Sequence, residues 1–82
     1  MKYDTVGIGE VVRQCNVTEK QLRYWQEAGY INPDKVICGE RTYRQYGESD
    51  VALITEIKRL LDKGFTLANA VRIARKNIEG KK

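Results

Sequence analysis

The chain has 82 residues, of which 32% are charged and 41% hydrophobic, and it carries a formal net charge of +4 with a pI near 9.2. These values are typical of one small folded domain rather than a disordered chain, and a basic balance favours a polyanionic partner. No apolar run approaches the length of a membrane span, and the N-terminus lacks the apolar stretch of a signal peptide, so we expect a cytoplasmic protein without a membrane partner.

A first helix is predicted near the N-terminus. Its apolar residues recur at i, i+3, i+4 and i+7, the spacing of one helical face: Ile8, Val11, Val12 and Cys15. The residues before it are short and mixed, and Tyr3 and Val6 fit a small strand or arm.

The second predicted helix, residues 18–28, has start and stop signals at its two ends. Thr18 suits the N-cap, Gln21 completes a capping box, and Gly29 suits the left-handed position after the last turn. Only residues 15–17 separate the two apolar patterns. The pair therefore fits a helix-turn-helix, whose second helix enters the major groove of DNA, and an ordinary pair of antiparallel helices is the alternative.

A β-hairpin is predicted next, over residues 36–46. Its two strand-favouring runs, residues 36–38 and 41–46, flank a turn at Gly39 and Glu40. The side chains of the second run alternate between two faces: Arg41, Tyr43 and Gln45 on one, and Thr42, Arg44 and Tyr46 on the other. The sequence does not tell which face packs inward. Arginine pairs with phosphate and tyrosine can donate to it, so the hairpin fits a wing along a DNA backbone, and an ordinary surface hairpin is an equally weighted alternative.

Two further helices complete the predicted fold. The third starts after Gly47 and ends at Gly64, and the fourth is capped by Thr66. The third helix has an apolar stripe of Val51, Ile54, Ile57 and Leu61, flanked by Leu53 and Leu60, and the fourth has Leu67, Ala70, Val71 and Ala74. We predict a mainly α fold of about four helices with a small β-hairpin, a winged helix-turn-helix. One domain spans residues 1–78, and residues 79–82 form a disordered basic tail.

The positive charge is concentrated toward the C-terminus. Residues 56–82 contain eight Lys or Arg against three acids, whereas residues 11–44 contain six against four. The general basic bias therefore lies in the last helices and the tail. Any DNA-contacting surface on the second helix therefore depends on a few individual Lys and Arg side chains.

The composition offers little to catalysis or metal binding. There is no histidine, and Cys15 and Cys38 are too far apart for a C-x-x-C motif and lack a neighbouring base. Cys15 lies on an apolar stripe, which favours a buried hydrophobic role. We predict no enzymatic activity, no metal site and no cofactor.

Five blocks of sequence, in order and at consistent spacing over most of residues 3–75, resemble the MerR family of bacterial transcription regulators. They are Ile8-Gly9-Glu10, Leu22-Arg23-Tyr24-Trp25, Ala28-Gly29-Tyr30-Ile31, Tyr43-Arg44-Gln45-Tyr46 and Gly64-Phe65-Thr66-Leu67. The resemblance implies a DNA-binding domain with its second helix in the major groove and its wing on neighbouring backbone. It also implies binding to pseudo-palindromic promoters as a dimer, with distortion of the DNA that realigns promoter elements for RNA polymerase.

The resemblance assigns roles to single residues. Arg23 and Tyr24 match the family's Leu-Arg-Tyr-Tyr, where Arg and Tyr face DNA, and Arg44 matches the arginine of the wing's Tyr-Arg-x-Tyr. Lys20 and Gln21 fall where the recognition helix varies, and we expect them to contact bases. The predicted DNA-binding residues are Thr18, Lys20, Gln21, Arg23, Tyr24, Arg41, Tyr43 and Arg44.

The chain departs from the family pattern in several places. Asn16 stands where the turn usually has glycine, which is tolerable because Asn visits the left-handed region. Trp25 replaces the second tyrosine and is interpreted as a packing anchor. Family members usually continue into a long dimerisation helix and an effector domain, and nothing after Ile78 fits either, so we interpret the chain as a fragment, a short member that dimerises differently, or an accessory module.

Sequence-specific binding to a double-stranded promoter or operator for transcriptional regulation is therefore the predicted function, with helix 18–28 in the major groove and wing 36–46 on the flanking backbone. A homodimer, formed through residues missing here or through a weak interface, and RNA polymerase are further partners that the resemblance allows. The alternative is a protein-binding module of the same fold that regulates a partner such as a chaperone, because an acidic protein would also favour the arginines.

Overall fold

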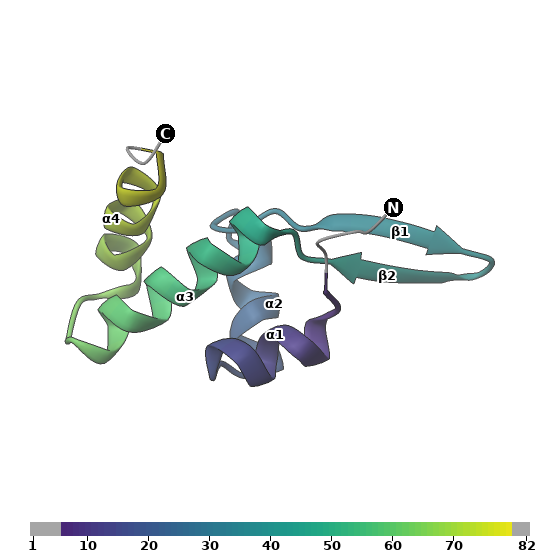
Figure 1. Cartoon of the computed structure of the whole chain (residues 1–82), viewed down its shortest axis with the longest axis horizontal. Helices are drawn as coiled ribbons and strands as arrows, with labels where there is room; N and C mark the ends of the chain where they lie inside the picture. The colour runs from purple at the N-terminus through teal and green to yellow at the C-terminus, as the bar shows by residue number, and fades with distance from the viewer. Residues whose placement is uncertain (1–5, 80–82) are drawn as a thin grey trace.

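The computed structural model describes residues 6–79, without the side chains of residues 36–38, 41–43 and 79. Its elements, in chain order, are α1 (Ile8–Cys15), α2 (Glu19–Glu27), β1 (Asp34–Cys38), β2 (Arg41–Gln45), α3 (Glu48–Asp62) and α4 (Leu67–Glu79). Figure 1 shows them as a helical body from which the hairpin extends. The predicted mainly α fold with one small β-hairpin is confirmed. Tyr3 and the predicted tail, apart from Glu79, lie outside the described residues.

The core gathers the apolar faces of all four helices around α3. In the described part of the chain, the fully or nearly fully buried hydrophobic side chains are Val11, Cys15, Val17, Leu22, Trp25, Ile31, Tyr46, Ile54, Ile57, Leu60, Ala70, Val71 and Ala74. α3 packs on α4 and α1, and α1 packs on α2. The predicted stripe of α3 is shifted, because Leu60 is buried while Leu61 only lines the core.

Local signals fix the ends of α3 and the start of α4. The backbone N–H of Gly47 donates to Asp50 Oδ2 at 3.0 Å, which closes the first turn of α3. Gly64 follows the last turn with φ +103°, a left-handed conformation that costs glycine nothing. Thr66 Oγ1 accepts from the backbone N–H of Asn69 at 3.3 Å and caps α4, as predicted.

The hairpin begins earlier than predicted. Its antiparallel register pairs Asp34 with Gln45 and Cys38 with Arg41, so the first strand starts two residues before the apolar run. Tyr46 lies just past β2 and forms an isolated bridge with Val6, through backbone hydrogen bonds of 2.8 and 2.9 Å. Because Tyr46 is fully buried, the face that it shares with Arg44 turns inward at the base of the hairpin.

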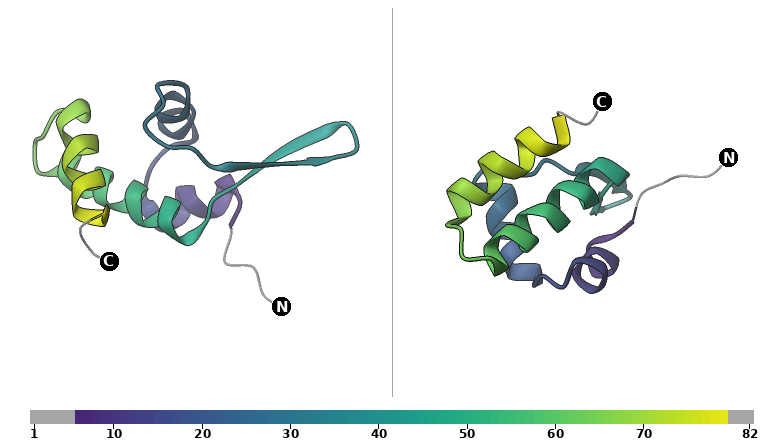
Figure 2. Two further views of the ribbon diagram at one scale, coloured as in Figure 1. Left: turned by 90° about the horizontal axis from the view of Figure 1, so that it is seen from above. Right: turned by 60° about the vertical axis from the view of Figure 1, so that its left-hand side comes forward.

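The arrangement leaves α2 prominent. Seen from above, α2 stands on one side of α3, with the hairpin extending to one flank and α4 on the other (Figure 2, left). Within residues 6–79, no helix is long and apolar enough to cross a membrane. The hairpin and α4 therefore lie on either side of α2 (Figure 2).

Candidate nucleic-acid interface

The N-terminal end of α2 is held by a complete capping box. The backbone N–H of Gln21 donates to Thr18 Oγ1 at 3.0 Å, and Gln21 Oε1 accepts from the backbone N–H of Thr18 at 2.9 Å. Val17 before the cap and Leu22 in the first turns are both buried, which fixes the direction in which the chain enters the helix. The start of α2 is therefore held by both hydrogen bonds and packing.

The C-terminal end of α2 is closed by a Schellman motif. The N–H of Tyr30 donates to the carbonyl of Trp25 at 2.9 Å, and the N–H of Gly29 donates to that of Gln26 at 3.1 Å. Gly29 has φ +84°, as the motif requires. Both predicted end signals of this helix are confirmed.

The turn before α2 and its inner face set the orientation of the helix. Asn16 takes the left-handed conformation, φ +58°, at the end of α1. Leu22 and Trp25 are buried, with exposed fractions of 0% and 2%, so both side chains belong to the core. The interpretation of Trp25 as a packing anchor is confirmed.

The opposite face of α2 presents most of its predicted contact residues to solvent. Lys20, Arg23 and Tyr24 are exposed, and Tyr24 has an exposed fraction of 56%. Gln21 is only partly exposed because its side chain folds back on Thr18. An exposed tyrosine beside two cations is an array that can contact phosphates and base edges.

The hairpin contributes two cations with described side chains, Arg44 and its cross-strand partner Lys35. Arg44 is partly buried, and its Nε has no hydrogen-bond partner among the described residues. The backbones of Arg41 and Tyr43 lie in β2, but their side chains are outside the described residues. Arg44 is thus the predicted wing residue whose environment is known.

Charges on both the hairpin and α2 influence the pKa of the buried Tyr46 hydroxyl. Burial raises the pKa of its hydroxyl, the negative charges of Asp50 and Glu19 add to the increase in pKa, and the positive charges of Arg44 and Arg23 oppose it. Charges from α2 and β2 therefore act on the same buried phenol.

A basic groove on the other flank of α2 was missed when contact residues were predicted. It lies between α4 and the loop after α2, and its lining residues are Tyr30, Ala68, Val71, Arg72, Arg75 and Lys76. Arg75 Nη2 donates to the carbonyls of Gly29 and Tyr30, at 2.8 and 2.9 Å. The charge excess of residues 56–82 was the available signal, but periodicity does not tell where α4 docks.

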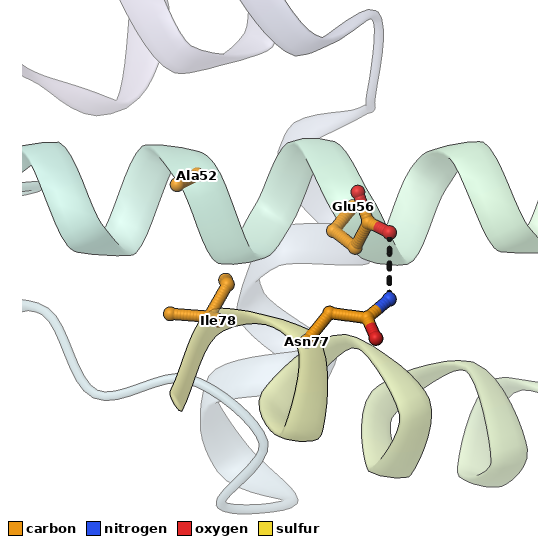
Figure 3. Close-up of a pocket in the computed structure, with 4 residues that line it drawn as sticks. All are labelled: Ala52, Glu56, Asn77 and Ile78. Carbon is orange, nitrogen blue, oxygen red and sulfur yellow. Dashed lines mark hydrogen bonds between the residues drawn. The ribbon is translucent and has the colours of Figure 1, made fainter. Parts of the chain in front are cut away.

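A second surface pocket lies between α3 and α4. Ala52 and Glu56 of α3 face Asn77 and Ile78 of α4 across it (Figure 3). Asn77 Nδ2 donates to Glu56 Oε2 at 3.1 Å, and Glu56 also forms an ion pair with Arg59. These contacts satisfy polar groups at a helix–helix junction, so a structural role accounts for them.

The described residues contain no cluster of three or more His, Cys, Asp or Glu side chains arranged to hold a metal ion. Cys15 is a free, buried thiol, and its Sγ lies 3.2 Å from Thr55 Oγ1. That contact and its burial agree with the predicted role of Cys15 as a small core residue. The side chain of Cys38 lies outside the described residues.

Comparison with known proteins identifies relatives. Residues 7–77 match the MerR HTH family regulatory proteins. The chain is 34% identical over 62 residues to the heavy metal-dependent transcription regulator 2 of Rhizobium meliloti, an alignment that covers 76% of this chain and 41% of that protein. It is 36% identical over 61 residues to the mercuric resistance operon regulatory protein of Bacillus cereus, covering 73% of this chain and 44% of the relative.

A match of 28% identity over 81 residues, to the HTH-type transcriptional repressor CarH of Myxococcus xanthus, covers 98% of this chain and 26% of that protein. The chain thus spans less than half the length of these relatives. The family match extends from the start of α1 nearly to the end of α4 and includes the capped helix, the hairpin and the basic groove. On this evidence the chain belongs to the MerR family of helix-turn-helix regulatory proteins.

Proposed function

We propose that this chain is a sequence-specific, double-stranded DNA-binding module that regulates transcription. α2 enters the major groove, and the hairpin lies against the backbone on one side. The observation that carries this proposal is the exposed array of Lys20, Arg23 and Tyr24 on a helix fixed at both ends. A helix that reads bases must keep its side chains in register with the groove, and the two caps supply that rigidity.

Arg44 supports the proposed position of the wing. The side chain of Arg44 is partly exposed, and its Nε is buried without a partner among the described residues, so an outward turn of the side chain would let Nε donate to a phosphate oxygen. The charges of Arg23 and Arg44 both influence the phenol of Tyr46, which supports the proposal that α2 and the wing contact one stretch of DNA. Arg72 and Lys76 in the α4 groove provide a further backbone contact on the opposite flank.

The test is selection from a random duplex pool, followed by a salt titration on the enriched sequence. We expect one enriched consensus and a steep linear fall of log affinity with log salt, with a slope of about −0.9 for each phosphate neutralised. Arg44→Ala should reduce that slope by about one phosphate, across all sequences. A palindromic consensus would indicate a dimer, and a half-site would indicate a monomer.

The competing function is a protein-binding module that uses the same basic face. It predicts no enriched DNA sequence and binding of an acidic protein surface instead. An absence of enrichment, with the fold intact by circular dichroism, would overturn the DNA-binding proposal and favour a protein partner.

A further inference from the structure

We propose that Gln21 reads DNA through its amide nitrogen alone, and that it therefore prefers guanine, whose major-groove edge has two acceptors, over adenine, whose edge has one acceptor beside an amino group. This inference rests on the proposed function and specifies its substrate. Glutamine is commonly paired with adenine, because one amide can donate to N7 and accept from the N6 amino group. In this chain the amide oxygen of Gln21 already accepts from the backbone N–H of Thr18.

The geometry assigns the two ends of the Gln21 amide. A backbone N–H can only donate, so the atom that faces the Thr18 N–H at 2.9 Å must be the oxygen Oε1. The Thr18 hydroxyl lies 3.5 Å from the same oxygen. An amide oxygen has two lone pairs, and both of its close neighbours are here supplied by Thr18. Nε2, with two N–H donors, is the end left for a ligand.

Reading adenine through its N6 amino group would therefore break the capping box. Turning Oε1 toward an N6 amino group would leave the Thr18 N–H without its acceptor at the start of α2. Guanine needs no such exchange, because its major-groove edge presents two acceptors, N7 and O6, and thymine presents O4. The cap is kept only when the base contact uses acceptors, and guanine offers N7 and O6 where adenine offers only N7.

The neighbouring side chains have the same polarity. Lys20 and Arg23 are exposed and have hydrogen-bond donors but no acceptor. Together with Nε2 of Gln21 they form a donor-rich surface, in which the hydroxyl of Tyr24 is the group that can also accept. Such a surface fits a guanine-containing half-site better than one read through adenine amino groups.

Two substitutions separate the donor from the acceptor. Gln21→Glu keeps an oxygen for the capping box but replaces the donor with a second oxygen, so it should prefer the amino group of cytosine or adenine at the affected base pair. Gln21→Lys loses the capping oxygen but keeps a donor, so it should keep the wild-type preference with lower helix stability. Each preference should amount to roughly tenfold in affinity.

The experiment is selection of wild type and both variants from one random duplex pool, with thermal unfolding measured in parallel. We expect a G·C pair in the wild type at the position that changes in Gln21→Glu, and the same pair in the same orientation with Gln21→Lys. An A·T pair in the wild type at that position would overturn the inference. An unchanged consensus in both variants would overturn it while leaving the proposed function standing. If the wild type enriches nothing, both fail.

Discussion

Arg75 connects α4 to the loop that follows α2, because its Nη2 donates to the carbonyl oxygen of Gly29 at 2.8 Å. The same nitrogen donates to the carbonyl of Tyr30 at 2.9 Å. These carbonyls follow the Schellman motif and have no role in the helix ladder. The position of α2 therefore depends on a helix that begins almost 40 residues further along the chain.

Replacing Arg75 with alanine should loosen this connection. We expect the free energy of unfolding to fall by about 1 kcal/mol, the net contribution of a typical exposed hydrogen-bonding group, and DNA affinity to fall with it. Urea denaturation measures the first effect and fluorescence anisotropy the second. Arg72→Ala is the matched control for stability, because Arg72 belongs to the same helix and donates to Asn69 instead. Equal losses of stability in both variants would contradict a special role for Arg75.

The charge of Arg23 should matter for DNA binding and not for folding. Arg23→Ala should weaken binding to the selected duplex by about 1 kcal/mol or more and leave the unfolding midpoint within a few degrees, because the side chain is exposed. The control is Arg59→Ala, which removes the same net charge from an arginine already paired with Glu56 on α3. If the two variants bind DNA equally, the effect is one of net charge and the proposed surface is wrong.

Local sequence predicted the recognition helix well because each of its signals lies within a few residues. Thr18 and Gln21 meet three positions apart, and Gly29 ends the helix by its own conformational freedom. The burial of Leu22 and Trp25 follows from helical periodicity alone. Such features need no knowledge of the rest of the chain.

The remaining features depend on contacts between distant segments. β1 starts at Asp34 because that residue pairs with Gln45, and the inward face of the hairpin is fixed where Tyr46 meets Val6. Leu60 is buried in place of Leu61 because of how α3 meets α4. Periodicity places a residue on a face, but packing decides how deeply it is buried.

The phenol of Tyr46 makes stability depend on pH in the alkaline range. Burial raises its pKa above the ordinary value of about 10, so the folded protein keeps the proton while the unfolded chain releases it. Its contribution to stability is therefore complete below about pH 10 and is lost as pH rises through the folded-state pKa. Wild type should lose more free energy of unfolding than Tyr46→Phe between about pH 9 and 11.

The same variant tests the hydroxyl at neutral pH. Tyr46 is fully buried, and its OH has no hydrogen-bond partner among the described residues, so Tyr46→Phe should leave stability unchanged or raise it by up to about 1 kcal/mol. Parallel urea titrations at neutral and alkaline pH measure both effects. If the free energies of unfolding of wild type and Tyr46→Phe change equally with pH, the Tyr46 phenol is not the source of the alkaline pH dependence. A clear loss of stability in Tyr46→Phe at neutral pH would mean that the hydroxyl forms a hydrogen bond in the folded protein.

The turn residue Asn16 offers a test of how α1 is connected to α2. Its φ of +58° is a conformation that glycine adopts freely, asparagine tolerates and alanine resists. Asn16→Gly should therefore keep stability within about 0.5 kcal/mol, whereas Asn16→Ala should cost about 1 kcal/mol. Because Asn16 is exposed, lost packing adds little to either value. Gln14→Ala, at an exposed helical position of α1, is the control for shortening a polar side chain. Equal stability of the Gly and Ala variants at position 16 would show that the left-handed turn is not required.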